Sequence, residues 1–236
     1  MPTRGGPDLP YDVVAGVTPC PPGWLVASAK LHGMTFAPED PAVYETFAEV
    51  LSVKPAYSVI ALNVPVGYPH EVHSGGRTCD RMARRLLGRR GTAIQSPPTR
   101  DVLANGHIPV DDHLAAVSLS LLPRIREVAL EMAPYRQRSV FEVHPELSFY
   151  QLNSDKPMRW SKKFQAGQEE RRALLVKRIQ GVDRILDAQI EGVEPGHLTD
   201  AAAILWTARR IAARAATRIP EEPEWDDEGL RMELVR

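Results

Sequence analysis

The stretch YSVIALNV, residues 57–64, is the most informative segment for the fold. Its apolar residues run almost without interruption, which is typical of a strand buried on both faces of a sheet. The turn-forming residues PVGYP follow at positions 65–69 and are expected to end the strand. The segment therefore predicts a protein built around a buried central strand.

The neighbouring segments supply further strands. Residues 13–17 and 24–29 are short runs with strand character on either side of the turn sequence TPCPPG, so they predict a hairpin. A third short strand is expected between positions 31 and 36, and residues 139–143, SVFEV, are another candidate. Strands mixed with helices in this order predict an α/β protein with a mixed sheet covered by helices, an order that fits many folds.

Helical spacing of apolar residues appears in five segments. The first helix is opened by Asp40-Pro41 and has apolar positions at Val43, Phe47, Val50 and Leu51. The other four helices are expected at residues 77–88, from Asp111 or Asp112 to about Met132, at residues 165–179, and from Thr199-Asp200 through Ile211. Residues 92–110 are punctuated by proline and glycine and predict a loop.

Composition limits the class of protein. The chain has 236 residues, is 43% hydrophobic and carries a formal net charge of −1, so it can bury one core and gives no global electrostatic argument for a nucleic-acid partner. Residues 221–228 hold six acids and no base. We expect a flexible leader at 1–10, one domain at 11–220 and an acidic C-terminal extension at 221–236.

Cysteine usage and hydropathy bear on location. Cys20 and Cys79 are too few for a disulfide framework and too far apart for a CxxC pair, and packing or site-lining roles are favoured over a nucleophile. No stretch approaches the roughly 18 apolar residues that would cross a bilayer, and the N-terminus has no apolar signal core. A cytoplasmic protein without a membrane partner is expected. The sequence does not indicate an oligomeric state.

Polar residues at segment ends are the first candidates for a site, because α/β sheets build their sites where strands meet turns. Asn63 and Glu142 each interrupt an apolar strand. An unpaired buried polar group costs about 1 to 3 kcal/mol, so both need a reason. Instead of serving a site, Asn63 could form hydrogen bonds to nearby backbone in a turn. Glu142 could likewise face solvent from an edge strand.

Two further acids and a histidine have similar alternatives. Asp200 is favoured by the helix dipole alone if it lies in a first turn, yet its i+4, i+7 and i+11 neighbours, Ile204, Thr207 and Ile211, form a face that should turn inward. His144 and Glu146 flank Pro145 at a strand exit. His144 is either a hydrogen-bonded structural residue or a catalytic one.

Basic residues cluster in two parts of the sequence. Arginine-rich faces suit phosphate contacts because the guanidinium group can bind two oxygens at once, although charged faces of amphipathic helices are usually just solvated. Trp160, beside Ser161-Lys162-Lys163, is the best candidate for stacking on a base. The two clusters are Arg77, Arg81, Arg84, Arg85, Arg89, Arg90 and Arg100, and Arg159, Lys162, Lys163, Arg171, Arg172, Lys177 and Arg178.

Seven ordered motifs together resemble those of the DUF429 family, whose members are regarded as predicted ribonuclease H-like nucleases. They span about residues 13–233. The motifs are GVTPCPPGW (16–24), NVPVGYP (63–69), RTCDRMARRLLG (77–88), FEVHPELSF (141–149), SKK (161–163), LTDAAAILWTARR (198–210) and GLRME (229–233). The resemblance implies a ribonuclease H-like mixed five-stranded sheet flanked by helices, with helical insertions.

The resemblance also implies a set of site residues. Two divalent metals, Mg²⁺ or Mn²⁺, are held by converging carboxylates in ribonuclease H-like enzymes, because these hard cations prefer oxygen ligands. The positions where the family has Asp are Thr18 and Asn63 here, so two expected anions are neutral. The expected metal ligands are Asn63, Glu142 and Asp200, the catalytic residues are Glu142, His144, Glu146 and Asp200, and the substrate-binding residues are Thr18, Arg77, Arg81, Arg84, Lys162 and Lys163.

Three functions follow from these residues. The first is a metal-dependent nuclease with a partly degenerate carboxylate site, because losing two formal charges should weaken metal binding severely. The second is a catalytically inactive nucleic-acid-binding or regulatory module. The third is a repurposed cleft for a small phosphorylated or carboxylated metabolite, for which no glycine-rich phosphate loop indicates an ATP site.

Overall fold

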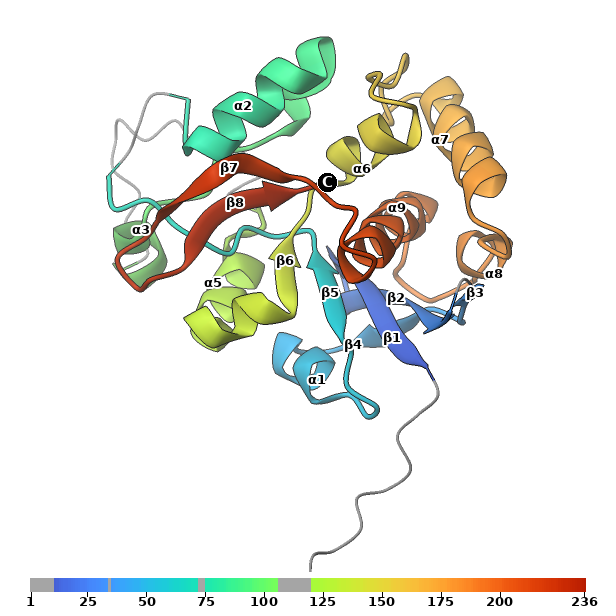
Figure 1. The fold of residues 1–236 in the computed structure, drawn as a ribbon, viewed down its shortest axis with the longest axis horizontal. Coiled ribbons are helices and arrows are strands. Elements are labelled where there is room, and N and C mark those ends of the chain that lie inside the picture. Colours follow the sequence, from blue (N-terminus) through green and yellow to red (C-terminus); the bar gives the residue numbers. More distant parts are fainter. Residues whose placement is uncertain (1–10, 34, 72–74, 106–119) are drawn as a thin grey trace, which may run out of the picture.

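A mixed sheet forms the centre of the molecule (Figure 1). The structure is a computed structural model that describes residues 11–33, 35–71, 75–105 and 120–236. In the sheet the strand order is β3-β2-β1-β5-β6, and the short β4 also pairs with β2. The strands are β1 Asp12–Cys20, β2 Gly23–His32, β3 Thr35–Pro38, β4 Ala42–Tyr44, β5 Val59–Leu62 and β6 Val140–Glu142.

Strand direction decides where a site can form. β1 is antiparallel to β2 and parallel to β5, and β5 is parallel to β6. The ribonuclease H-like mixed five-stranded sheet flanked by helices is therefore confirmed, with β4 as a sixth strand. Because β1, β5 and β6 run in the same direction, their carboxyl ends meet at one edge of the sheet, which is where α/β sheets place their sites.

Alternation along the strands separates two apolar cores. Val14 points to the face covered by α9, whereas Ala15 and Val17 point to the face covered by α1 and α5. Figure 1 shows the sheet between these two groups of helices. The helices are α1 Phe47–Ser52, α2 Thr78–Leu87, α3 Arg100–Asn105, α5 Leu122–Glu131, α6 Pro145–Leu152, α7 Gln165–Arg178, α8 Asp183–Leu186 and α9 Pro195–Ala212, with 3₁₀ helices at Gly88–Ala93 and Pro134–Arg138.

Two sequence predictions of local structure are wrong. The helix expected from Asp40-Pro41 is replaced by β4 and a later helix, α1, because Thr46 and Glu49 form a capping box that starts the helix at Phe47. The loop expected over residues 92–110 contains the helix α3. The expected start at Asp111 or Asp112 of the helix that reaches Met132 lies outside the described residues.

The last long helix begins earlier than its sequence predicts. Pro195 occupies the first turn of α9, and Glu194 and His197 form the capping interactions at its start. Asp200 therefore lies in the second turn, away from the free N–H groups of the helix end. Its proximity to the helix dipole does not account for its position.

The C-terminal residues are part of the packed structure. β7 Arg218–Trp225 and β8 Arg231–Val235 pair as an antiparallel hairpin, so the division expected between residues 220 and 221 falls inside β7. Leu230, Leu234 and Val235 are buried in three different apolar clusters. The expected leader, residues 1–10, lies outside the described residues, and no described helix is long and apolar enough to cross a membrane.

Gly16 fixes the distance between β1 and α9. A Cβ placed on Gly16 would lie 2.4 Å from the carbonyl oxygen of Ala201 and 2.5 Å from the amide nitrogen of Leu205, both in the helix backbone. We expect Gly16→Ala to lower the free energy of unfolding by at least about 2 kcal/mol, since a packed helix backbone cannot yield without loss of contacts. Urea denaturation measures this change.

Gly196, in the first turn of α9, is the matched control. A Cβ there would meet no atom within 4 Å. Gly196→Ala should change stability by less than about 1 kcal/mol, and in the favourable direction. Equal effects of the two substitutions would contradict the close contact between β1 and α9.

Candidate functional site

A cleft of about 430 Å³ lies at the carboxyl ends of β5 and β6. Its walls come from the loop after β5, the 3₁₀ helix Gly88–Ala93 with the residues that follow it, the start of α6, the segment before α7 and the second turn of α9. The expected site residues that line it are Asn63, Glu142, His144, Glu146, Lys162, Lys163 and Asp200. The fold thus gathers residues that are up to 137 positions apart in the sequence.

Two neutral side chains occupy the positions where the resemblance implies acids. Asn63 follows β5 directly, and its Nδ2 donates a hydrogen bond of 2.9 Å to Oγ1 of Thr18 near the end of β1. Asn63 lines the cleft, and Thr18 is buried beneath the cleft with 2% of its surface exposed. The pair joins the ends of two adjacent strands without a formal charge.

Glu142, the last residue of β6, forms a buried ion pair with Arg77. Both side chains are almost completely buried, and Oε2 of Glu142 also accepts a hydrogen bond of 2.9 Å from the backbone of Val66. The same guanidinium donates to both carboxylate oxygens of Asp80, at 2.8 and 3.2 Å, and to the carbonyl of Gly67. These contacts use the five N–H donors of Arg77.

Glu146, in the first turn of α6, is held by two arginines. Nη2 of Arg171 lies 2.6 Å from Oε1 of Glu146, and Nη2 of Arg90 lies 3.3 Å from the same oxygen. Oε2 of Glu146 is buried and has no hydrogen-bond partner among the described residues. Glu146 therefore retains one oxygen that can accept a hydrogen bond from a ligand or water.

Asp200 points from α9 towards the segment before α7. Its Oδ2 lies 2.6 Å from Nζ of Lys162, whose side chain is half exposed. The Asp200 side chain is only 10% exposed, so the pair lies at the boundary between cleft and solvent. Because Lys162 is anchored at one side only, its ammonium group keeps donors that can face a bound anion.

His144 is held in its neutral form. Its Nδ1 accepts a hydrogen bond of 3.2 Å from the backbone of Glu146, and the ring also hydrogen-bonds to the backbone of Ala93. Burial, with Lys162 as the next cause, lowers the pKa of His144 to about 4. The ring is thus engaged with backbone groups, which favours the structural alternative for this residue.

Three expected substrate-binding arginines lie elsewhere. Arg77 has no free donor for a substrate, and Arg81 and Arg84 bond to backbone carbonyls and hydroxyls of the loops around α2. Neither Arg81 nor Arg84 lines the cleft. Phosphate contacts by these three residues are replaced by structural roles, because their guanidinium groups hold α2 against its neighbouring loops.

Three neighbours of the cleft residues are not among the site residues that the sequence predicts: Asp80, Arg90 and Arg171. Arg90 and Arg171 appear there only as members of the two basic clusters. The helical spacing of the sequence places two of these residues, Asp80 and Arg171, on the buried faces of their helices. Asp80 shares the buried face of α2 with Ala83 and Leu87, and Arg171 shares the buried face of α7 with Leu175. A charge on a buried stripe requires a partner, and for Arg171 that partner is Glu146. The sequence offered no comparable signal for Arg90.

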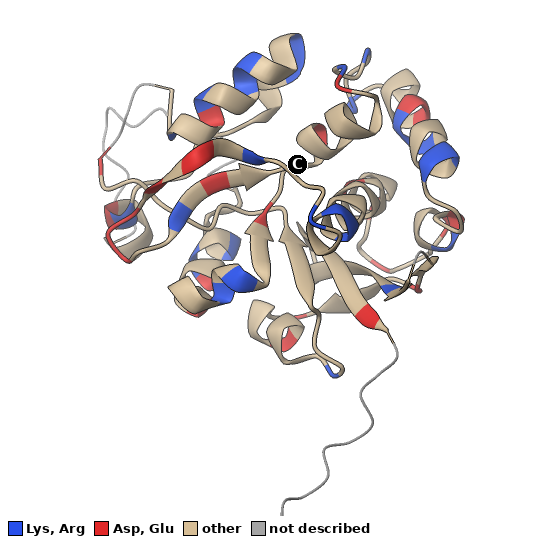
Figure 2. Cartoon of the chain, viewed as in Figure 1, with Lys and Arg blue, Asp and Glu red and all other residues tan. Residues whose placement is uncertain are grey.

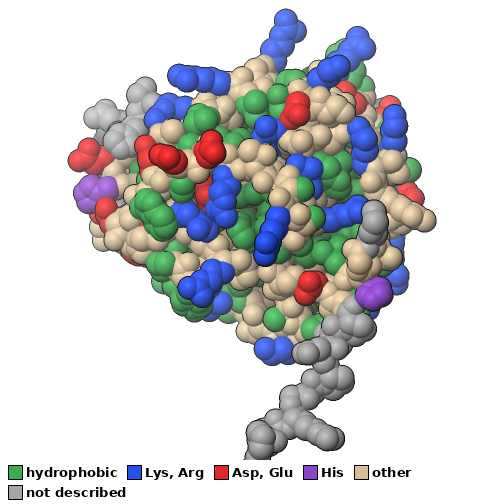
Figure 3. Space-filling model, in the orientation of Figure 1, with side chains coloured by type: hydrophobic (Ala, Val, Ile, Leu, Met, Phe, Trp, Pro, Cys, Tyr) green, Lys and Arg blue, Asp and Glu red, His purple; other side chains and the backbone are tan. Residues whose placement is uncertain are grey.

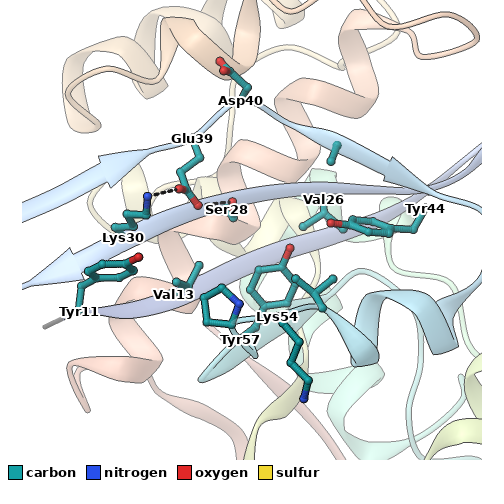
Figure 4. A pocket seen from close by; sticks show the side chains of 13 residues that line it. Tyr11, Val13, Val26, Ser28, Lys30, Glu39, Asp40, Tyr44, Lys54 and Tyr57 are labelled. Atoms are coloured by element: carbon teal, nitrogen blue, oxygen red, sulfur yellow. Dashed lines mark hydrogen bonds and ion pairs between the residues drawn. The ribbon is translucent and has the colours of Figure 1, made fainter. Parts of the chain in front are cut away.

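A second hollow adjoins the cleft. It also measures about 430 Å³, lies between the starts of α7 and α9, and shares Lys162, Lys163 and Asp200 with the cleft. A separate hollow of about 350 Å³ lies at the opposite ends of β1 and β5, among Tyr11, Tyr57 and the Lys30–Glu39 ion pair (Figure 4). It contains none of the expected site residues.

Basic side chains are unevenly distributed over the surface. Figure 2 shows several Lys and Arg residues on α2 and α7 and several Glu residues on β7. In Figure 3, basic side chains project at the upper edge of the face in view, where α2 and the connection between α6 and α7 lie, and acidic side chains gather over β7. A surface with separated charges of this kind orients an approaching polyanion.

Residues 12–225 match the family described as a protein of unknown function, DUF429. The chain belongs to this family. No curated protein matches the sequence. The solved structure of RuvC from Thermus thermophilus is similar to it with 16% identity, a TM-score of 0.35, and coverage of 86% of this chain and 97% of that chain. The assignment of the fold rests on the strand order itself.

The divalent metal implied for this DUF429 protein does not fit the residues present. Glu142 and Asp200 are already paired with Arg77 and Lys162, and Asn63 donates its amide to Thr18. Within the described ranges, no group of three or more His, Cys, Asp or Glu side chains is arranged to hold a metal ion. A hard cation needs several oxygens that converge on one position, whereas the acids of this cleft are held in separate ion pairs with Arg77, Arg171 and Lys162.

Removing Arg77 should destabilise the protein severely. Arg77→Met leaves Glu142 and Asp80 as buried carboxylates without their counter-charge, so we expect the free energy of unfolding to fall by about 3 to 5 kcal/mol. Urea denaturation measures the loss. Arg85→Met is the control. Arg85 lies on the exposed side of α2, and its replacement should change the free energy of unfolding by less than about 0.5 kcal/mol.

A second step tests the cause of that loss. Adding Asp80→Asn and Glu142→Gln to Arg77→Met removes the unpaired charges while nearly keeping the side-chain volumes, and should recover part of the stability. If the triple variant is no more stable than Arg77→Met, lost packing rather than unpaired charge explains the effect.

His144 provides a pH test. Its folded-state pKa of about 4 lies below the ordinary value of 6.5, so protonation favours the unfolded chain. The stability contributed by neutral His144 is complete above pH 6.5 and is lost as the pH falls from 6.5 to about 4. NMR titration of the ring protons, assigned with a His144→Gln variant, should give a midpoint near 4. A midpoint near 6.5 would show that the ring is not held neutral by its surroundings.

Proposed function

We propose that this DUF429 protein binds nucleic acid through the phosphate backbone in the cleft, without metal-dependent cleavage. The observation that carries the proposal is that basic side chains of the chain itself neutralise the acids of the cleft. Glu142 and Asp80 pair with Arg77, Glu146 pairs with Arg171 and Arg90, and Asp200 pairs with Lys162.

The exposure of the basic partners rises towards solvent. The side chains of Arg77 and Arg171 are 1% exposed, that of Arg90 is 17% exposed and that of Lys162 is 50% exposed. Arg77 and Arg171 stabilise buried carboxylates, whereas Arg90 and Lys162 can also face a ligand. Lys163 is exposed in the same wall and forms no salt bridge with another described residue, so the mouth of the cleft carries an uncompensated positive charge.

The shape of the site favours a polymer over a single small metabolite. The cleft and the adjoining hollow are both lined by Lys162, Lys163 and Asp200, and we call the two together the trough. Each part alone has the volume of an ordinary small-molecule pocket. A chain of phosphates can occupy both parts and pass over the two lysines between them, which a single metabolite cannot do.

The test is salt-dependent binding of a labelled oligonucleotide measured by fluorescence anisotropy. Affinity should fall as salt rises because phosphate binding releases counterions. Lys163→Ala should weaken binding and lower the slope of log affinity against log salt by about one. Lys177→Ala, an exposed lysine on α7 that does not line either hollow, is the matched control and should leave the slope unchanged.

Two outcomes would contradict the proposal. One is the absence of binding at low salt by folded wild-type protein. The other is cleavage of the oligonucleotide with Mg²⁺ or Mn²⁺ that Asp200→Asn abolishes, which would identify a nuclease instead. Thr18→Asp/Asn63→Asp restores the two acids of the family pattern, and metal-dependent cleavage by this variant alone would identify the wild-type cleft as a degenerate nuclease site.

A further inference from the structure

Two aromatic side chains are exposed beside the lysines of the cleft. Trp160 is 45% exposed and Phe164 is 66% exposed, and they flank Lys162 and Lys163 in the sequence. The guanidinium of Arg159, also exposed, lies 5.0 Å from the ring centre of Trp160. We call residues 159–164, between α6 and α7 in Figure 1, the aromatic segment.

The backbone of the aromatic segment is fixed by α7. The carboxylate of Glu170 accepts hydrogen bonds of 3.0 Å from the amide groups of both Arg159 and Trp160. Nη1 of Arg171 donates to the carbonyl of Trp160 at 3.0 Å. A Cβ on Gly167 would lie only 2.0 Å from the carbonyl of Ser161, so the segment and the helix are in direct backbone contact.

The same contacts connect the aromatic segment to the cleft. Arg171, which holds Trp160, also binds Glu146, and Lys162 binds Asp200. Ser161, Lys162 and Lys163 of the segment line the trough, whereas Trp160 and Phe164 are exposed at either end of these residues and line neither hollow. The backbone that carries both rings is well anchored. Single exposed apolar residues are common, but two large rings held close to two lysines on an anchored backbone have the composition of a binding surface.

We infer that the aromatic segment is a stacking surface for the bases of single-stranded nucleic acid, with Trp160 and Phe164 contacting bases and Lys162 and Lys163 contacting phosphates. The inference rests on the proposed function and names its substrate class. Single strands expose the flat faces of their bases to such rings, whereas a duplex keeps them stacked inside. The two rings flank the two lysines, so the segment offers contacts to both the bases and the phosphates of one strand.

The experiment compares two labelled probes that carry the same phosphates. One is an oligothymidylate, and the other is an abasic oligomer of equal length, which keeps the charges but has no bases. Trp160→Ala and Phe164→Ala should each weaken oligothymidylate binding about five- to a hundredfold and leave binding of the abasic oligomer unchanged. Lys163→Ala should weaken the binding of both probes.

Trp225→Ala is the matched control, because Trp225 is also an exposed tryptophan, 61% exposed, that lies on β7 and not in the aromatic segment. It should leave the binding of both probes unchanged. Binding of an oligouridylate distinguishes RNA from DNA. Binding of a duplex of the same length should not change in Trp160→Ala. Quenching of the Trp160 emission by oligothymidylate, and not by the abasic oligomer, gives a second readout that does not depend on the affinity measurement.

The outcomes separate the two proposals. If wild-type protein binds neither probe, the proposed function fails and this inference fails with it. If both probes bind with equal affinity, and if Trp160→Ala and Phe164→Ala behave like Trp225→Ala, phosphate binding stands and base stacking is overturned. Unchanged thermal melting of the variants shows that any loss of binding is not a loss of fold.

Discussion

The buried guanidinium of Arg77 is the constraint on which the site depends. Removing such a charge from water is strongly unfavourable unless every donor finds an acceptor. Arg77 meets this condition by joining Asp80 of its own helix, the end of β6 at Glu142 and the carbonyl of Gly67. It therefore sets the position of α2 against the sheet, and with it one side of the cleft. It also removes Glu142 from the set of free carboxylates.

Two further ion pairs between an acid and a basic side chain lie nearer the mouth of the cleft, and the burial of their basic side chains decreases towards solvent. Arg171 compensates Glu146 inside the structure, and Lys162 compensates Asp200 at the surface. In a two-metal site, carboxylates are held together by the cations between them. Here arginine and lysine side chains neutralise the acids, so the arrangement is stable without an added ion. Among the described residues, the acids of the cleft are joined to cations of the chain itself and are not grouped around a common metal position.

Rigidity links the cleft to its surroundings. Glu170 and Arg171 fix the aromatic segment, and Gly16 allows α9 to lie against β1, which places Asp200 at the shared wall of the trough. Preorganised groups lose little conformational entropy when a ligand binds. The backbone that carries Trp160 and the position of Asp200 are thus determined by contacts made elsewhere in the fold.

The sequence by itself determined the central strand, the helices α2, α7 and α9, and the residue types at the two positions where the family resemblance implies acids. The run 57–64 contains β5, and the hairpin, α2 and α7 lie close to their expected bounds, because hydrophobic periodicity reports local burial. Thr18 and Asn63 were identifiable as neutral from residue type alone. The misplaced helix after Asp40 shows the limit of periodicity where a capping box decides the helix start.

Only the tertiary structure decided which charges meet. Arg77 and Glu142 are 65 positions apart, Lys162 and Asp200 are 38 apart, and Arg171 and Glu146 are 25 apart. Residue patterns describe one element at a time, whereas an ion pair depends on which ends of different elements the packing brings together. That is why the sequence indicated acids for a metal and arginines for a substrate, and the fold joined several of them to one another.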